Sequence, residues 1–101
     1  MNLQYSDYAI QQLENILFFL VKEQGLPFEK AYEIRQQIFD KVDLLFNNLS
    51  IGQREEYLDK LSLSHRRLVV GNYKIIYLIE MDAIIITDIF DTLQDPTKMK
   101  G

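Results

Sequence analysis

The 101-residue sequence contains no cysteine, no tryptophan and only one histidine. Without cysteine it can form neither a disulfide framework nor a thiolate metal site, and His65 alone cannot build a zinc site. No apolar run reaches the roughly 18 residues that a membrane-spanning helix needs. The first residues also lack the basic region and apolar core of a signal peptide. We therefore expect a cytoplasmic protein that uses no metal or other cofactor and does not enter a membrane.

The sequence has no surplus of basic residues. It contains 11 lysines and arginines and 15 acidic residues, which gives a net charge of −4. Proteins that hold nucleic acid by themselves usually carry such a surplus, since phosphate contacts supply most of their affinity. The negative net charge argues against autonomous nucleic-acid binding, although it allows a local basic patch. The length and the 48% hydrophobic content are ordinary for one folded domain, which we place at residues 1–101.

Three runs rich in β-branched and aromatic residues, separated by two-residue breaks, fill the stretch from Arg66 to Phe90. This pattern predicts a three-stranded antiparallel meander. Gly71-Asn72 suits the first turn, because both residues tolerate positive φ; Met81-Asp82 is a poorer turn by composition. With two-residue turns, Val70 lies opposite Tyr73, and Glu80 lies opposite Ala83.

Alternation of side chains along these strands then defines two faces. We assign the larger, more aromatic face to the core. It carries Arg66, Leu68, Val70, Tyr73, Ile75, Tyr77, Ile79, Ile84, Ile86, Asp88 and Phe90. Because Arg66 and Asp88 fall on this face, we interpret them as a partly buried structural charge pair.

The other face is mixed. It places Arg67 near Lys74, and its apolar residues are too many to stay bare on a stable monomer. Either the C-terminal tail or a partner must cover them, by strand addition at a sheet edge or by a helix laid on the face. We predict a partner-binding surface made of Val69, Ile76, Leu78, Ile85, Ile89 and Leu93.

The first half of the chain predicts a short strand and two helices. Residues 2–6 form the strand, and Ser6 suits the N-cap of a helix from Asp7 to about Glu23. Gly25 fits the end of that helix and Pro27 the first turn of a second one, which runs to Asn47 or Asn48. The short link suggests an antiparallel helix hairpin.

The remaining segments are less regular. Residues 50–64 show only partial apolar anchoring, and the polar tail from Asp91 to Gly101 is expected to leave the sheet edge. The fold class is therefore α+β: an N-terminal strand and a two-helix hairpin packed on a C-terminal antiparallel meander.

The element order, the segment from Arg66 to Tyr77 and the segment from Ile89 to Pro96 resemble the RelE/ParE superfamily of toxins from type II toxin–antitoxin modules. In many relatives arginine stands where this chain has Leu93. The resemblance implies one of two activities on one fold. RelE-like members are ribosome-dependent mRNA endoribonucleases, whereas ParE-like members bind DNA gyrase and trap it on cleaved DNA. Both are neutralised by an antitoxin protein that is usually encoded beside them.

The resemblance also implies candidate residues. A metal-free ribonuclease needs a base, an acid and cations for the phosphate, and Arg67 and Lys74 match two basic positions of the nucleases, with His65 as a possible acid or base. Against this, Leu93 replaces a common arginine and no tyrosine or histidine follows Tyr77. We therefore favour a ParE-like gyrase inhibitor without chemistry of its own. A RelE-like nuclease acting on ribosome-bound mRNA and a degenerate, non-toxic member remain the alternatives, with self-association as a further use of the apolar face.

Overall fold

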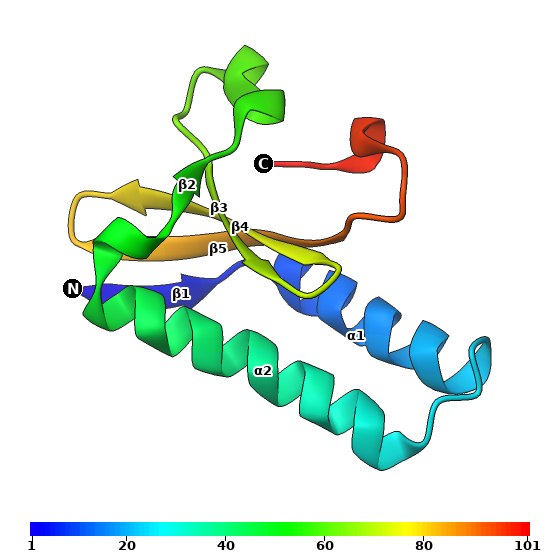
Figure 1. The fold of residues 1–101 in the computed structure, drawn as a ribbon. Helices are drawn as coiled ribbons and strands as arrows, with labels where there is room; N and C mark the ends of the chain where they lie inside the picture. Colours follow the sequence, from blue (N-terminus) through cyan, green and yellow to red (C-terminus); the bar gives the residue numbers. More distant parts are fainter.

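The computed structural model describes residues 1–101 as a mixed five-stranded sheet with two long helices on one face (Figure 1). The sheet order is β1-β5-β4-β3-β2. The predicted α+β class is confirmed. In chain order the elements are β1 (Asn2–Tyr5), α1 (Asp7–Lys22), α2 (Phe28–Asn47), the 3-10 turn η1 (Leu49–Ile51), β2 (Gln53–Arg54), the 3-10 turn η2 (Glu56–Leu61), β3 (Arg66–Val70), β4 (Tyr73–Glu80), β5 (Ala83–Asp91) and the 3-10 turn η3 (Pro96–Lys98).

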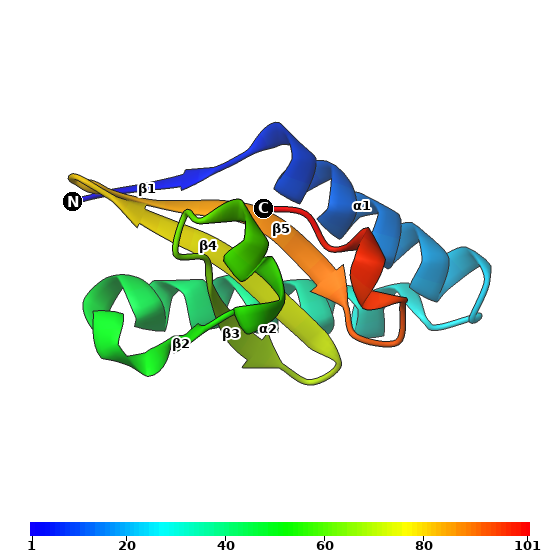
Figure 2. The same ribbon diagram turned by 90° about the horizontal axis from the view of Figure 1, so that it is seen from above.

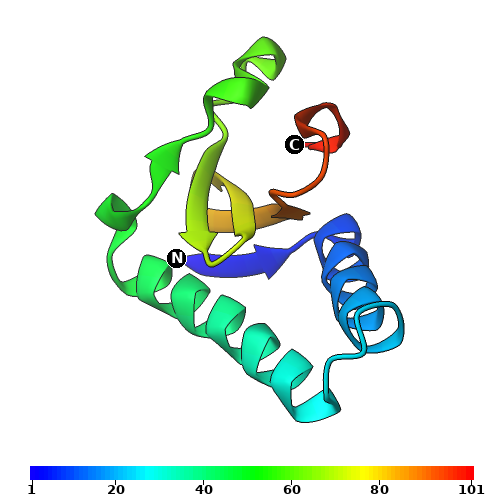
Figure 3. The same cartoon turned by 45° about the vertical axis from the view of Figure 1, so that its right-hand side comes forward.

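Local signals fix the helix ends. The Ala9 N–H donates to Ser6 Oγ at 3.0 Å, which confirms Ser6 as the N-cap of α1. Gly25 has a φ of 68°, the left-handed conformation that glycine adopts without steric cost. Pro27 is the N-cap of α2 and not its first helical residue. The two helices diverge from the loop that joins them (Figure 3), and neither has the length and apolar content that crossing a bilayer requires.

The meander forms as predicted at its first turn. Val70 lies opposite Tyr73, and the pairing continues to Arg66 opposite Tyr77. The second turn also has two residues, and Met81 takes a positive φ of 46° there. The first strand, β1, adds parallel to β5, so that the N-terminal strand and the last strand lie side by side.

A β-bulge corrects the predicted faces of β5. Tyr77 lies opposite Ile86, but Ile76 lies opposite Asp88, which leaves Thr87 as an extra residue. Beyond the bulge the side chains of β5 exchange faces. Ile89 joins the core beneath the helices, whereas Phe90 belongs to the opposite face. The prediction was wrong for Asp88, Ile89 and Phe90, because alternation was extended through a strand that contains one unpaired residue.

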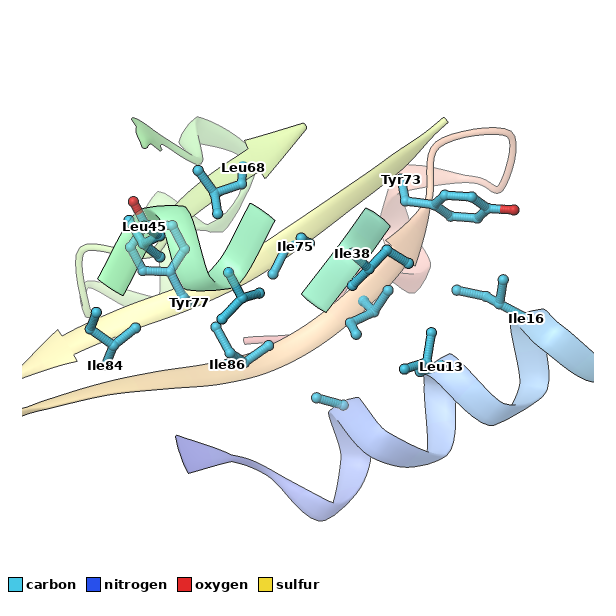
Figure 4. Packing of buried hydrophobic residues seen from close by; sticks show 13 residues of the cluster. Leu13, Ile16, Ile38, Leu45, Leu68, Tyr73, Ile75, Tyr77, Ile84 and Ile86 are labelled. Atoms are coloured by element: carbon cyan, nitrogen blue, oxygen red, sulfur yellow. The ribbon is translucent and has the colours of Figure 1, made fainter. Parts of the chain in front are cut away.

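The main core lies between the sheet and the two helices (Figure 4). Its apolar side chains come from α1, α2 and the three meander strands, and most are completely shielded from solvent. Removing this much apolar surface from water is the main stabilising contribution to the fold. The buried members are Ala9, Leu13, Ile16, Ile38, Val42, Leu45, Leu68, Tyr73, Ile75, Tyr77, Ile84, Ile86 and Ile89.

A second, smaller cluster covers the other face of the sheet. Leu58 from η2 and Met99 from the C-terminal segment pack with Ile76 and Phe90. Figure 2 shows both covering segments lying over β4 and β5. Of the two alternatives for covering this face, the tail is the one observed, although the tail was also expected to leave the sheet edge: Met99 is 5% exposed, because its side chain closes an apolar face that the chain itself must bury.

Candidate functional site

Arg67 and Lys74 lie on the face away from the helices, as predicted, and they meet at a buried carboxylate. Lys74 Nζ is 2.7 Å from Glu55 Oε1, and an Arg67 guanidinium nitrogen is 3.6 Å from the same oxygen. Glu55 is 2% exposed, whereas the two basic side chains are about one-quarter exposed. Both cations are therefore compensated by one internal anion.

The position of Glu55 follows from the short strand β2. This strand pairs with β3, which brings the next residue against the sheet, and the Glu55 N–H donates to the His65 carbonyl at 2.9 Å. Glu55 Oε2 accepts from the Tyr57 N–H at 3.1 Å and so caps η2. Both carboxylate oxygens are thus engaged. Sequence reasoning missed Glu55 because β2 lies in the segment that showed no regular periodicity.

Arg67 is held further by both residues of β2. It donates to the carbonyl of Arg54 at 2.6 Å and to Gln53 Oε1 at 3.4 Å. A phosphate group would have to compete with these acceptors and with Glu55 for the same donors. The pair is brought together as predicted, but its hydrogen bonds and ion pairs are those of a structural cluster on the sheet.

His65, the third nuclease candidate, is buried. It is 1% exposed, neither ring nitrogen makes a hydrogen bond, and burial lowers its pKa. The ring lies under the C-terminal residue, because a Cβ added to Gly101 would come within 2.2 Å of His65 Nε2. A histidine in this position has no hydrogen-bonded path to Arg67 or Lys74, so it does not complete an acid–base set with them.

The predicted Arg66–Asp88 pair does not form. Arg66 donates to the Gly52 carbonyl at 2.7 Å and to Tyr77 Oη at 3.3 Å, and so ties β2 to the sheet. Asp88 lies on the opposite face, where its Oδ2 accepts from the Lys100 N–H at 3.1 Å. The bulge at Thr87 is the physical reason, because it turns Asp88 away from the face that carries Arg66.

Asp88 is fully buried, and its Oδ1 accepts no hydrogen bond. Burial raises the pKa of this carboxyl from 3.8 to about 6, against the opposing effect of the Lys100 and Ile89 N–H groups. The folded protein therefore favours the protonated form more than the unfolded chain does. Asp88 costs stability when it is ionised, and that cost develops as the pH rises from about 4 to about 6.

Asp88→Asn is expected to raise the free energy of unfolding at pH 8 by about 2 kcal/mol. The shift of the pKa corresponds to about 3 kcal/mol, from which about 1 kcal/mol is lost because the new amide group is buried without a partner. Urea unfolding at pH 8 measures the gain, which should give way to a loss of about 1 kcal/mol below about pH 3, where the aspartic acid is neutral in both states and only the cost of the buried amide remains.

Asp95→Asn provides the control. The pKa of Asp95 is lowered by the hydrogen bonds from Thr97, so removing this charge should reduce stability at pH 8. An Asp88→Asn gain that did not depend on pH would contradict the assignment of the cost to the buried charge.

The predicted partner-binding surface is largely covered by the chain itself. Three of its six residues are buried, and Ile85 is half-buried. Val69 and Leu93 remain exposed, at 52% and 81%. The apolar face therefore needs no partner to be stable. The three buried residues, which we withdraw from the surface, are Ile76, Leu78 and Ile89.

No group of three histidine, cysteine, aspartate or glutamate side chains is arranged to hold a metal ion. A groove lies beside α1, at one end of the sheet, with Leu93 on its wall. The molecule thus has two distinctive surface features at the predicted site residues: a face whose two cations are paired with a buried carboxylate, and an apolar groove. The architecture, with a strand and two helices preceding a meander, is the one that the resemblance to the RelE/ParE superfamily implied.

Comparison with known families agrees with that class. The family model described as the ParE toxin of the type II toxin–antitoxin system, parDE, matches residues 3–96. The chain therefore belongs to the ParE toxin family of toxin–antitoxin modules.

Comparison with solved structures supports the fold. A chain from the chromosomal ParDE toxin–antitoxin system of P. aeruginosa superposes with a TM-score of 0.69 at 22% sequence identity, over 88% of this chain and 92% of that chain. Comparison with curated protein sequences finds no match.

Proposed function

We propose that this chain inhibits DNA gyrase by binding it, carries out no chemical reaction of its own, and is neutralised by a cognate antitoxin protein. Membership of the ParE toxin family is the starting point. Because gyrase acts on the chromosome, the place of action would be the cytoplasm. The protein would need neither a cofactor nor direct binding to nucleic acid.

The observation that carries the choice against a nuclease is the buried Glu55. Its carboxylate lies 2.7 Å from Lys74 Nζ and 3.6 Å from Arg67, the two cations that a RelE-like reaction would use. Cleavage through the 2′-hydroxyl needs uncompensated positive charge at the phosphate. It also needs a general acid or base within hydrogen-bond reach, and His65 makes no hydrogen bond.

The proposal is tested with purified toxin in two assays run side by side. In a supercoiling assay with gyrase, relaxed plasmid and ATP, we expect loss of supercoiling and accumulation of cleaved DNA trapped by gyrase. In a coupled translation assay, we expect full-length mRNA and undiminished protein synthesis. Adding the antitoxin before the toxin should restore supercoiling.

Each other outcome overturns the proposal in a defined way. Cut mRNA in the translation assay, with supercoiling intact, would establish the nuclease. Intact supercoiling and intact mRNA, with folded toxin in excess over both targets, would identify a degenerate member of the family.

A further inference from the structure

A polar pocket of about 440 Å³ lies where β2, η2 and the start of β3 meet. No apolar side chain lines it, and its lining residues are Arg54, Asp59, Ser62, Ser64 and Arg66. Pockets for small molecules usually have mostly apolar walls with a few polar groups. A pocket lined only by charged and hydroxyl side chains therefore suits a small, charged ligand.

The fold places two arginines side by side in this pocket. Arg54 on β2 lies directly opposite Arg66 on β3, and like charges in that arrangement repel each other. Arg54 has an anionic partner, because its guanidinium donates to both carboxylate oxygens of Asp59. Arg66 donates only to neutral oxygens, those of Gly52 and Tyr77. The pocket thus holds two cations and one anion, and the charge of Arg66 is not paired.

The guanidinium of Arg66 is held in a fixed position. Its Nε donates to Tyr77 Oη at 3.3 Å and one Nη donates to the Gly52 carbonyl at 2.7 Å, and Tyr77 is completely buried in the main core. A guanidinium has more N–H donors than these two bonds use. The others form part of a planar array that matches the oxygens of a carboxylate or a phosphate. Because Arg66 is already ordered, little conformational entropy would be lost when such a ligand binds.

The loop between η2 and β3 adds neutral donors. Ser62 and Ser64 have positive φ values of 57° and 63°, which are uncommon for residues other than glycine. The backbone N–H groups of Leu63, Ser64 and His65, in the same loop, donate to no backbone carbonyl. Successive N–H groups beside left-handed residues form concave anion-binding sites, and backbone strain of this kind clusters at binding sites.

Asp59 is the anion that a ligand would have to replace. The hydrogen bond from Arg54, together with the charge of Arg54, lowers the pKa of Asp59, so this carboxylate is ionised at neutral pH. The side chain of Arg54 is 66% exposed and that of Asp59 is 38% exposed. Ion pairs with this exposure contribute little stability. Arg54 can therefore exchange Asp59 for an anion that enters the pocket.

We propose that this pocket binds a phosphate group, either as inorganic phosphate or as the phosphate of a small phosphomonoester. Arg66 supplies the fixed cation, Arg54 turns from Asp59 to the ligand, and the serine loop supplies neutral donors. A phosphomonoester carries a charge of about −1.5 to −2 at pH 7, which is more than the single charge of a carboxylate. It therefore gains more from two arginines than Asp59 does.

This inference goes beyond the proposed function, because neither gyrase inhibition nor neutralisation requires a phosphate ligand. Arg67 and Lys74 take no part in it, since Glu55 compensates both. The net charge of −4 disfavours a nucleic-acid backbone as the source of the phosphate, because a polymer of that charge would meet the rest of the acidic surface.

Inorganic phosphate is the first probe, added to the free toxin at constant ionic strength with chloride as the reference anion. We expect saturable changes in the amide NMR signals of the loop that carries Ser62 and Ser64. Arg54→Gln should weaken phosphate binding about tenfold, the loss expected for one hydrogen-bonded charge. Asp59→Asn removes the competing carboxylate and should tighten binding about threefold. Lys60→Gln removes an exposed cation of η2 that does not line the pocket, and should change the affinity by less than about twofold.

The opposite signs of the Arg54 and Asp59 effects separate binding from a loss of structure, because both variants break the same ion pair. A response that does not saturate, an equal response to chloride, or unchanged affinity in Asp59→Asn overturns the proposal. Dimethyl phosphate, a singly charged diester, tests the ligand class and should bind several-fold more weakly than inorganic phosphate. Displacement of phosphate by a short DNA duplex at physiological salt would assign the pocket to a nucleic-acid backbone and would also overturn the proposal.

Discussion

Gly52→Ala is expected to lower the free energy of unfolding by about 3 kcal/mol, near the upper end of the usual cost of overpacking. A Cβ at this position would lie 1.5 Å from Tyr77 Oη and 2.7 Å from Tyr77 Cζ. Tyr77 is completely buried in the main core, so its ring can move away only against the side chains packed around it. The clash would also disturb the bond from Arg66 to the Gly52 carbonyl, which joins β2 to the sheet. Thermal and urea unfolding measure the loss.

Tyr77→Phe provides the matched control, because it removes the hydroxyl that the new methyl group meets first. The double variant Gly52→Ala/Tyr77→Phe should be more stable than the sum of the two single losses predicts, with an interaction energy of about 1 kcal/mol. Strict additivity would indicate that the loss comes from the backbone and not from this contact.

The meander was predictable from its sequence because local signals agree along it. Gly71-Asn72 fixes the first turn, the runs of β-branched residues fix the strands, and the register from Val70 to Arg66 follows from the turn length. Ser6 and Gly25 were recognisable for the same reason, since a helix cap and a left-handed residue depend on near neighbours.

The bulge and the tail were not predictable in that way. Thr87 sits in a run of β-branched residues that reads as a continuous strand, and nothing adjacent to it marks an unpaired position. The place of Met99 depends on an apolar face built by Ile76 and Phe90, far from it in the chain. One extra residue thus changed the interpretation of Asp88 and Ile89, because every residue after a bulge exchanges faces.

The candidate site, too, could be predicted only in part from the sequence. Arg67 and Lys74 were placed together correctly by alternation, but their chemistry depends on Glu55, which reaches them from a two-residue strand. A pair of cations in a sheet pattern is equally compatible with a phosphate site and with an internal ion cluster. Glu55 decides between them, and its position beside the two cations depends on tertiary structure and not on local sequence.

Glu55→Ala is expected to lower the free energy of unfolding by about 3 kcal/mol, because it leaves Lys74 and Arg67 side by side without their common anion. The partial exposure of these two side chains keeps the cost at the lower end for a broken ion cluster, since water can reach them. The variant also removes the acceptor for the Tyr57 N–H at the start of η2. Urea unfolding at neutral pH measures the loss.

Two variants separate the contributions in this cluster. Glu56→Ala removes the neighbouring, exposed carboxylate and should change stability by less than about 0.5 kcal/mol. Lys74→Met added to Glu55→Ala relieves the repulsion with Arg67 and should recover about 1 kcal/mol or more. Equal losses from Glu55→Ala and Glu56→Ala would show that Glu55 does not compensate the two cations. The face would then offer free positive charge, and the main structural reason for preferring a gyrase-binding toxin over a ribonuclease would be lost.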